Sequence, residues 1–137
     1  MKISDVMTTE VHVVDPDATL RDAARKMRDL DVGSLPVHRD DKLVGMVTDR
    51  DIVVRGLAEG LDLDATVSAV MSDGVKYCYD DQPVADVAAN MGDIQVRRLP
   101  VVNREKRLVG FVSLANIAAA NEPTATDRLL DGTAEPH

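Results

Sequence analysis

The chain contains two copies of one sequence, and this constrains its fold more than any other feature. A shift of 64 positions aligns residues 3–37 with 67–101 without a gap, and 13 of the 35 aligned positions are identical. Chance at ordinary composition gives about two or three identities over such a length. One additional residue within 103–107 changes the shift to 65, after which 43–52 aligns with 108–117. The chain should therefore fold as two similar units.

Both copies predict elements in the order β-α-β-β-α. Short β-rich segments at 11–14 and 75–79 come first. A helix follows each, with apolar residues at i, i+3, i+4 and i+7, the spacing of one buried helix face. These apolar positions are Leu20, Ala23, Ala24, Met27 and Leu30 in the first copy, and Val84, Val87, Ala88, Met91 and Ile94 in the second. Asp17 and Thr19 offer N-cap oxygens to the first helix, and Pro83 suits the first turn of the second.

Two further strands and a second helix complete each copy. The strands are expected at 35–38 and 42–47, and at 99–102 and 107–112, and the helices at about 48–60 and 113–120. A unit of about 55 residues is too small to bury both faces of its sheet alone. We therefore predict an α/β (α+β) fold in which two repeats, 1–60 and 61–120, pack sheet to sheet with pseudo-two-fold symmetry. The tail at 121–137 is predicted to be a loose extension with one helical turn at 126–130.

Composition and charge exclude several classes of function. The formal net charge of −8 repels nucleic-acid phosphates and anionic lipid, so neither is an expected partner. Cys78 is the only cysteine, and His12, His38 and His137 show no metal-ligand spacing, so we expect no metal site. No apolar run approaches the ~20 residues of a membrane span, and the N-terminus shows no signal segment, which favours a cytoplasmic protein. No Ser-His-Asp or Cys-His arrangement can be identified, so we expect no enzyme.

The order and spacing of the motifs resemble the CBS-domain family, whose paired repeats form the unit called a Bateman module. The matching segments are 5–8, 14–27, 32–37 and 43–52 in the first copy, and 69–72, 95–102 and 108–117 in the second. The resemblance covers about residues 2–120, and the chain looks like small bacterial stand-alone CBS-pair proteins, which carry no catalytic domain. It implies two clefts between the repeats, which in ligand-binding members hold adenosyl compounds such as AMP, ATP or S-adenosylmethionine.

In ligand-binding members of that family, a Gly-x-x-Ser/Thr-x-x-Asp pattern joins the last strand to the last helix. This chain matches it with Gly45, Thr48 and Asp51. The glycine would let a ligand approach the backbone, the hydroxyl would bind a phosphate, and the carboxylate would accept both hydroxyls of a ribose. A structural interpretation is also open, because Thr48 and Asp51 fit a helix capping box. The second copy has 110–116 at this position, and the amide of Asn116 cannot match a carboxylate for a diol.

The family builds each cleft from both repeats, which implies two unequal sites. The ligand-binding cleft is expected to contain Thr48, Asp51, Met46, Met71, Val75, Lys76, Val96, Arg97 and Arg98. A second, weaker cleft is expected to contain Met7, Val11, His12, Gly33, Ser34, Phe111, Ser113 and Asn116. Arg97, Arg98 and Lys76 would give only the first cleft a phosphate clamp. A solvated strand edge or an interface salt bridge would explain the two arginines as well, and the repeated methionines also fit core packing.

The chain is therefore interpreted as a regulatory ligand-sensing module that binds an adenosine-containing ligand in the cleft between the repeats. Apart from such a nucleotide, no cofactor is expected. A homodimer is expected from the family and from the apolar helix faces at Ile52, Val53 and Leu57 and at 117–120, with a regulated protein as a further partner. The alternative is a protein-protein interaction and dimerisation scaffold whose cleft is vestigial.

Overall fold

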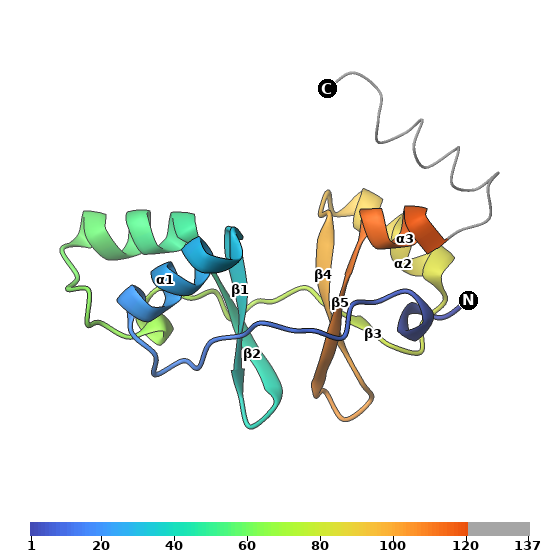
Figure 1. Cartoon of the computed structure of the whole chain (residues 1–137), viewed down its shortest axis with the longest axis horizontal. Helices are drawn as coiled ribbons and strands as arrows, with labels where there is room; N and C mark the ends of the chain where they lie inside the picture. The colour runs from blue at the N-terminus through green and yellow to red at the C-terminus, as the bar shows by residue number, and fades with distance from the viewer. Residues whose placement is uncertain (121–137) are drawn as a thin grey trace, which may run out of the picture. The chain divides into compact units, whose positions relative to one another are not determined.

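The computed structural model describes residues 1–120, which form two compact units (Figure 1). The first-repeat unit contains His12–Lys76 and Lys106–Leu108, and the second-repeat unit contains Met1–Val11, Tyr77–Glu105 and the chain from Val109 on. The limits of the compact units thus differ from the repeat limits expected at residues 60 and 61, because each repeat's entering segment packs with the other repeat's helices and strands. The expected tail and its helical turn lie outside the described residues.

A β-hairpin forms the sheet of the first-repeat unit. β1 (Ser34–Arg39) and β2 (Lys42–Thr48) are antiparallel, with Ser34 opposite Thr48. Both strands are confirmed, whereas the strand expected at 11–14 is reduced to one parallel bridge between Val14 and Val37. The Val14 N–H donates to the Pro36 carbonyl, but proline has no N–H with which to continue the ladder toward residue 12.

α1 (Leu20–Leu30) packs beside this hairpin and has the predicted buried face. Thr19 is its N-cap, and the Thr19 hydroxyl accepts a hydrogen bond from the Asp22 N–H at 3.1 Å. The helix ends at Asp31, whose left-handed φ of 55° prevents a further turn. Its buried residues join the core of the unit, which contains Val14, Leu20, Ala23, Met27, Leu35, Val37, Val47, Ile52, Val67 and Val70.

The helix expected at 48–60 is present but irregular. Its central part, η2 (Asp51–Gly56), is wound as a π-helix, and η3 (Leu57–Glu59) is a 3₁₀ turn that ends at Gly60 with a φ of 79°. A Cβ on Gly56 would lie 3.1 Å from Leu20 Cδ1, so the glycine allows η2 to approach α1 closely. A further short turn, η4 (Val67–Ala69), buries Val67 in the same core.

The second-repeat unit has a three-stranded sheet in the order β3-β4-β5. Its elements are η1 (Ile3–Asp5), β3 (Cys78–Tyr79), α2 (Val84–Asp93), β4 (Arg98–Val102), β5 (Leu108–Ser113) and α3 (Leu114–Ala120). Of the strand expected at 75–79, only β3 forms, parallel to β4. Pro83 is the N-cap of α2 with a ψ of 138°, one residue earlier than the first helical turn predicted for it.

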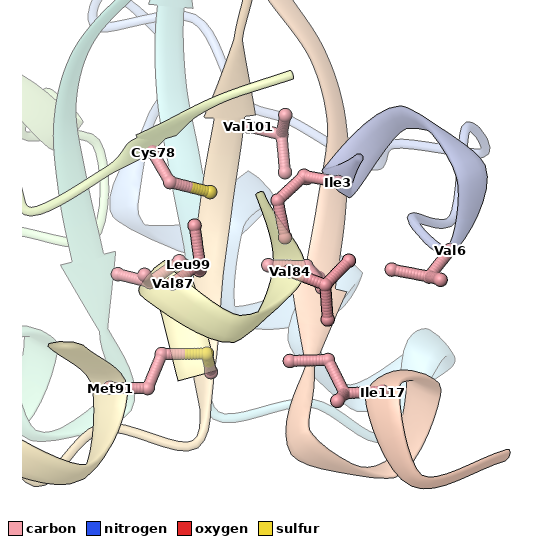
Figure 2. Packing of buried hydrophobic residues seen from close by; sticks show 10 residues of the cluster. Ile3, Val6, Cys78, Val84, Val87, Met91, Leu99, Val101 and Ile117 are labelled. Atoms are coloured by element: carbon pink, nitrogen blue, oxygen red, sulfur yellow. The ribbon is translucent and has the colours of Figure 1, made fainter. Parts of the chain in front are cut away.

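The core of the second-repeat unit is aliphatic and closely packed, as Figure 2 shows. It is formed by Ile3, Val6, Cys78, Val84, Val87, Met91, Leu99, Val101, Val112 and Ile117. Equivalent positions of the two repeats are buried alike, as predicted: these pairs are Val6 and Val70, Leu35 and Leu99, and Val47 and Val112. The mixed helix and strand class is therefore confirmed, whereas sheet-to-sheet packing stays a prediction.

Candidate functional site

The candidate site in the first-repeat unit is centred on Thr48, at the end of β2, and Asp51, at the start of η2. The Thr48 N–H donates to Asp51 Oδ2 at 3.0 Å, and the Asp51 N–H donates to Thr48 Oγ1 at 3.0 Å. These reciprocal bonds form the capping box that the sequence offered as a structural interpretation. The capping role is therefore real, and any ligand-binding role of Asp51 has to be compatible with it.

The two carboxylate oxygens of Asp51 differ in their contacts, because Oδ2 accepts the hydrogen bond from Thr48 whereas Oδ1 has only a longer contact with Arg55. Asp51 Oδ1 lies 3.9 Å from Arg55 Nη1, which is beyond hydrogen-bonding distance. The Asp51 side chain as a whole is 19% exposed. An ionised carboxylate accepts about four hydrogen bonds, so Asp51 can hold the cap and still accept donors from a ligand.

Arg55 connects η2 to the segment that enters the second repeat, and sequence reasoning did not identify it. Its Nη1 donates to the Val70 carbonyl at 3.1 Å and lies 3.5 Å from the Met71 carbonyl oxygen. The signal was available, because an aspartate followed by an arginine at i+4 forms an ion pair on one helix face. Arg55 thus approaches both Asp51 and the backbone of Met71, an expected cleft residue.

Gly45 has a packing role that the sequence did not predict. A Cβ at this position would lie 2.8 Å from the Ser72 carbonyl oxygen and 2.9 Å from Met71 Sδ. Ser72 also forms a two-bond antiparallel bridge with Met46, with both N···O distances 2.8 Å. The backbone that approaches Gly45 is therefore that of the entering segment, and the approach of a ligand to this glycine stays a prediction.

The same arrangement occurs at Gly110 in the second-repeat unit. A Cβ there would lie 2.7 Å from the Thr8 carbonyl oxygen and 2.9 Å from Met7 Sδ, and Thr8 is bridged to Phe111. Both Met7 and Met71 are half-buried and pack against the core of their own unit. Their recurrence in the sequence is thus explained by this packing, and contact with a ligand is not needed to account for it.

Two residues expected in the second cleft lie beside Thr48 within the first-repeat unit. Ser34 is opposite Thr48 in the hairpin, and the Gly33 carbonyl accepts a hydrogen bond from the Asp49 N–H at 2.9 Å. Asp49 Oδ2 lies 3.2 Å from the position of a Cβ on Gly33. Asp49 was expected only to stabilise the start of the helix and was not placed in either cleft, yet it puts a second carboxylate close to the Thr48 motif.

The motif in the second-repeat unit has the same backbone geometry with an amide in place of the carboxylate. Asn116 Oδ1 accepts from the Ser113 N–H at 3.0 Å and from Ser113 Oγ at 2.8 Å, while the Asn116 N–H donates to Ser113 Oγ at 3.0 Å. The single carbonyl oxygen of Asn116 is thus engaged twice. Asn116 therefore has little acceptor capacity left for a diol, and a weaker second cleft stays a prediction.

The two expected phosphate-clamp arginines lie beside this second motif within their own unit. The Arg98 guanidinium is 5.0 Å from the centroid of the Phe111 ring, a cation-π contact, and the Arg97 carbonyl accepts from the Leu114 N–H at 3.0 Å. Val96, expected with them, is half-buried against the core of the second-repeat unit. The approach of these three residues to Thr48 stays a prediction.

The other expected cleft residues lie in the entering segments. Val75 and Val11 are half-buried, whereas Lys76 and His12 are exposed. Lys76 and Val75 belong to the same unit as Thr48, and Val11 to the same unit as Ser113, while His12 belongs to the first-repeat unit. Within each unit, the entering segment contacts the strand before the motif through Met71 and Ser72 in the first-repeat unit, and through Met7 and Thr8 in the second-repeat unit.

Cys78 lies outside the two motifs, in the core of the second-repeat unit. Cys78 is buried in β3, and burial, with a smaller contribution from Asp80, raises the pKa of its thiol to about 11. The thiol is therefore neutral and packs as an apolar group, as expected (Figure 2).

Residues 1–120 contain no group of three or more His, Cys, Asp or Glu side chains placed to hold a metal ion. Nor does any helix among them have the length and apolar character to cross a membrane.

Comparison with known protein families finds the same domain in each of the two repeats. The model of the CBS domain matches residues 3–57 and again 67–122. Hypoxic response protein 1 of Mycobacterium tuberculosis is 44% identical over 116 residues, which is 83% of this chain and 80% of that protein. A crystal structure of Hypoxic Response Protein I with two coordinated zinc ions has a TM-score of 0.77 and 40% identity, covering 89% of this chain and all of that chain.

Two similar solved structures contain adenosine compounds. The CBS domain pair of MJ0100, in complex with 5′-methylthioadenosine and S-adenosyl-L-methionine, has a TM-score of 0.71 and 26% identity, covering 87% of this chain and 98% of that chain. CBSX2 in complex with AMP has a TM-score of 0.74 and 29% identity, covering 87% and 94%. CBS pairs similar to this chain thus bind both charged and uncharged adenosine derivatives.

Proposed function

The chain belongs to the CBS-domain family, and on that premise we propose that it is a regulatory module that binds an adenosine-containing ligand of the AMP, ATP or S-adenosylmethionine class through Thr48 and Asp51. The observation that carries this proposal is that the two carboxylate oxygens of Asp51 have different surroundings. One carboxylate oxygen caps the helix at 3.0 Å from the Thr48 nitrogen, and the other, 3.9 Å from Arg55, keeps acceptor capacity for ribose hydroxyls.

The similar structures support the class of ligand. MJ0100 was crystallised with 5′-methylthioadenosine and S-adenosylmethionine, and CBSX2 with AMP. In this proposal the protein is cytoplasmic and is not an enzyme. Ligand binding shifts the population of its conformations, and a partner protein recognises the change. Val75, Lys76, Val96, Arg97 and Arg98 are proposed to complete the ligand site.

A dimerisation scaffold is the second candidate function, because η2 and η3 expose apolar side chains. Val53, Val54 and Leu57 are 54%, 43% and 53% exposed. The sequence expected Ile52 and the segment 117–120 to join such a face, but Ile52 and Ile117 are buried in the cores of their own units. A proposed homodimer would therefore use Val53, Val54 and Leu57, and light scattering of the parent chain and of Val53→Glu at about 50 µM tests it.

Ligand-induced stabilisation separates the sensor from the scaffold. Thermal unfolding of the chain is measured alone and with AMP, ATP, S-adenosylmethionine or NAD at about 1 mM. A ligand present at 100 times its Kd stabilises the folded state by about 2.7 kcal/mol, which raises the Tm measurably. An increase in Tm with at least one adenosyl compound supports the sensor. No shift with any compound, confirmed by calorimetry, leaves the scaffold.

A further inference from the structure

Arg55 is the cation that the structure places against the ligand-binding carboxylate. Its Nη1 lies 3.9 Å from Asp51 Oδ1 and also makes the contacts with the Val70 and Met71 carbonyls. All hydrogen bonds found for the Arg55 side chain among residues 1–120 thus involve one nitrogen. A guanidinium carries five N–H donors, and the side chain is 55% exposed, so its remaining donors are accessible.

The charge of the surrounding residues makes this cation important for an anionic ligand. Asp49 and Asp51 both lie at the start of the helix after β2, and Asp49 also approaches Gly33. Two carboxylates oppose the entry of a phosphate group, because like charges a few ångströms apart repel each other strongly where water is partly excluded. Arg55 offsets this repulsion on the side of Asp51 that does not face Thr48.

The second copy lacks this cation. The shift of 65 that aligns the two motifs places Arg55 over Ala120, and Asp51 over Asn116. The carboxylate and its counter-charge are therefore both present in one copy and both absent from the other. The pairing indicates that the arginine belongs with the carboxylate as one recognition unit, beyond any general role in holding the helix.

We propose that Arg55 is a specificity-determining residue that makes the Thr48–Asp51 site prefer adenosine ligands with a 5′-phosphate over uncharged ones. This inference rests on the proposed function, since it concerns the same site. Arg55 neutralises Asp51, and its unshared N–H groups donate charge-assisted hydrogen bonds to a phosphate oxygen. The Val70 and Met71 carbonyls fix the orientation of the guanidinium in advance of ligand binding.

The test is calorimetric titration of the whole chain with AMP and, separately, with adenosine. The parent, Arg55→Gln, Arg55→Lys and Arg50→Gln are compared, the last as a matched control that removes an exposed arginine from the same helix. Arg55→Gln should weaken AMP binding by about five- to tenfold and adenosine binding by less than twofold. Arg55→Lys should restore most of the AMP affinity because it keeps the charge, and Arg50→Gln should leave the ratio of the two affinities unchanged.

Other outcomes overturn the inference in distinguishable ways. Equal losses for both ligands in Arg55→Gln, without recovery in Arg55→Lys, would show that Arg55 only holds the structure. A parent chain that binds adenosine as tightly as AMP would refute the specificity and leave the proposed function standing. A parent chain that binds neither ligand at millimolar concentration would refute both. Should Arg55→Gln fail to fold, Arg55→Ala takes its place with the same expected outcomes, because alanine occupies the aligned position 120 of the second copy.

Discussion

The Thr48–Asp51 motif and the Ser113–Asn116 motif share one backbone design but have different chemical surroundings. In each, a hydroxyl residue at the end of a strand and an Asp or Asn three residues later satisfy each other's backbone N–H groups at 3.0 Å. Each preceding glycine makes room for the backbone of an entering segment. The duplication has therefore preserved the geometry that the fold needs.

The side chains around the two motifs differ in charge. The first motif has Asp49, Asp51 and Arg55, where the second has Leu114, Asn116 and Ala120. The strand beside the second motif begins with Arg98, held over Phe111, where the first has Ser34 and Met46. Backbone hydrogen bonds therefore account for the geometry that the two motifs share, whereas their charged side chains would account for any difference in the ligands they bind.

The largest expected effect tests the shared part of the design. Gly45→Ala and Gly110→Ala each place a Cβ within 2.8 Å of a backbone carbonyl oxygen, which cannot move without displacing the bridge it belongs to. Overpacking of this kind costs about 1–3 kcal/mol. We expect both variants to lower the free energy of unfolding in urea by similar amounts near the top of that range. A loss at one glycine only would show that the two units are not built alike.

The next effect concerns the ligand and should separate the motifs. Asp51→Ala should weaken AMP binding by about tenfold or more, because a charge-assisted hydrogen bond contributes about 1.5–3 kcal/mol. Asn116→Ala should weaken it much less. Both variants lose a helix cap and should lose about 1 kcal/mol of stability alike, which urea unfolding measures.

Asp51→Asn is the sharper control, because it turns the first motif into the second. The amide keeps a cap acceptor, so stability should change little, while AMP affinity should fall almost as far as in Asp51→Ala. Equal losses of affinity from Asp51→Ala and Asn116→Ala in calorimetry would instead show that the two sites are equivalent.

How far the sequence predicts this structure depends on the range of the interactions involved. The hairpins and α1 follow from local patterns in the sequence. The N-cap role of Thr19 was also predicted from the sequence, and so was the replacement of the Asp51 carboxylate by the amide of Asn116 in the second motif. The role of Gly45 was not, because it depends on Ser72, 27 residues further along the chain, and no local pattern records that approach. Arg55 was missed for a different reason: its i+4 spacing was visible, but the Val70 and Met71 carbonyls that orient it come from the tertiary fold.

A smaller effect distinguishes the cores of the two units at alkaline pH. Cys78 aligns with Val14, so only the second-repeat unit buries an ionisable group at this position. Burial raises the pKa of the thiol from 9.0 to about 11. Because the folded pKa is the higher one, the thiol's contribution to stability is complete below pH 9 and is lost as pH rises to about 11. At pH 10 the loss should be about 1 kcal/mol.

Cys78→Val provides the matched comparison, because it installs the residue of the first repeat. The free energy of unfolding in urea is measured for both proteins at pH 7 and pH 10. The contributions of all other titrating groups then cancel in the difference between the two proteins. The parent should lose about 1 kcal/mol more than the variant between the two pH values. An equal loss in both proteins would mean that the thiol titrates normally and that the core of the second-repeat unit admits water.

The smallest expected effect comes from installing the missing carboxylate in the second motif. Asn116→Asp keeps an acceptor for both Ser113 donors and adds a second oxygen for a ribose. It does not add the counterpart of Arg55, because Ala120 occupies that position. We therefore expect a second adenosine site with a Kd in the millimolar range, visible as new chemical-shift changes around Ser113 in an NMR titration. New shifts would show that replacing the amide nitrogen by a carboxylate oxygen is enough to let the second motif bind adenosine. Their absence, with an intact fold, would move the cause of the difference to the other side chains that differ, such as Arg98 and Phe111, which form a cation-π contact where the first repeat has Ser34 and Met46.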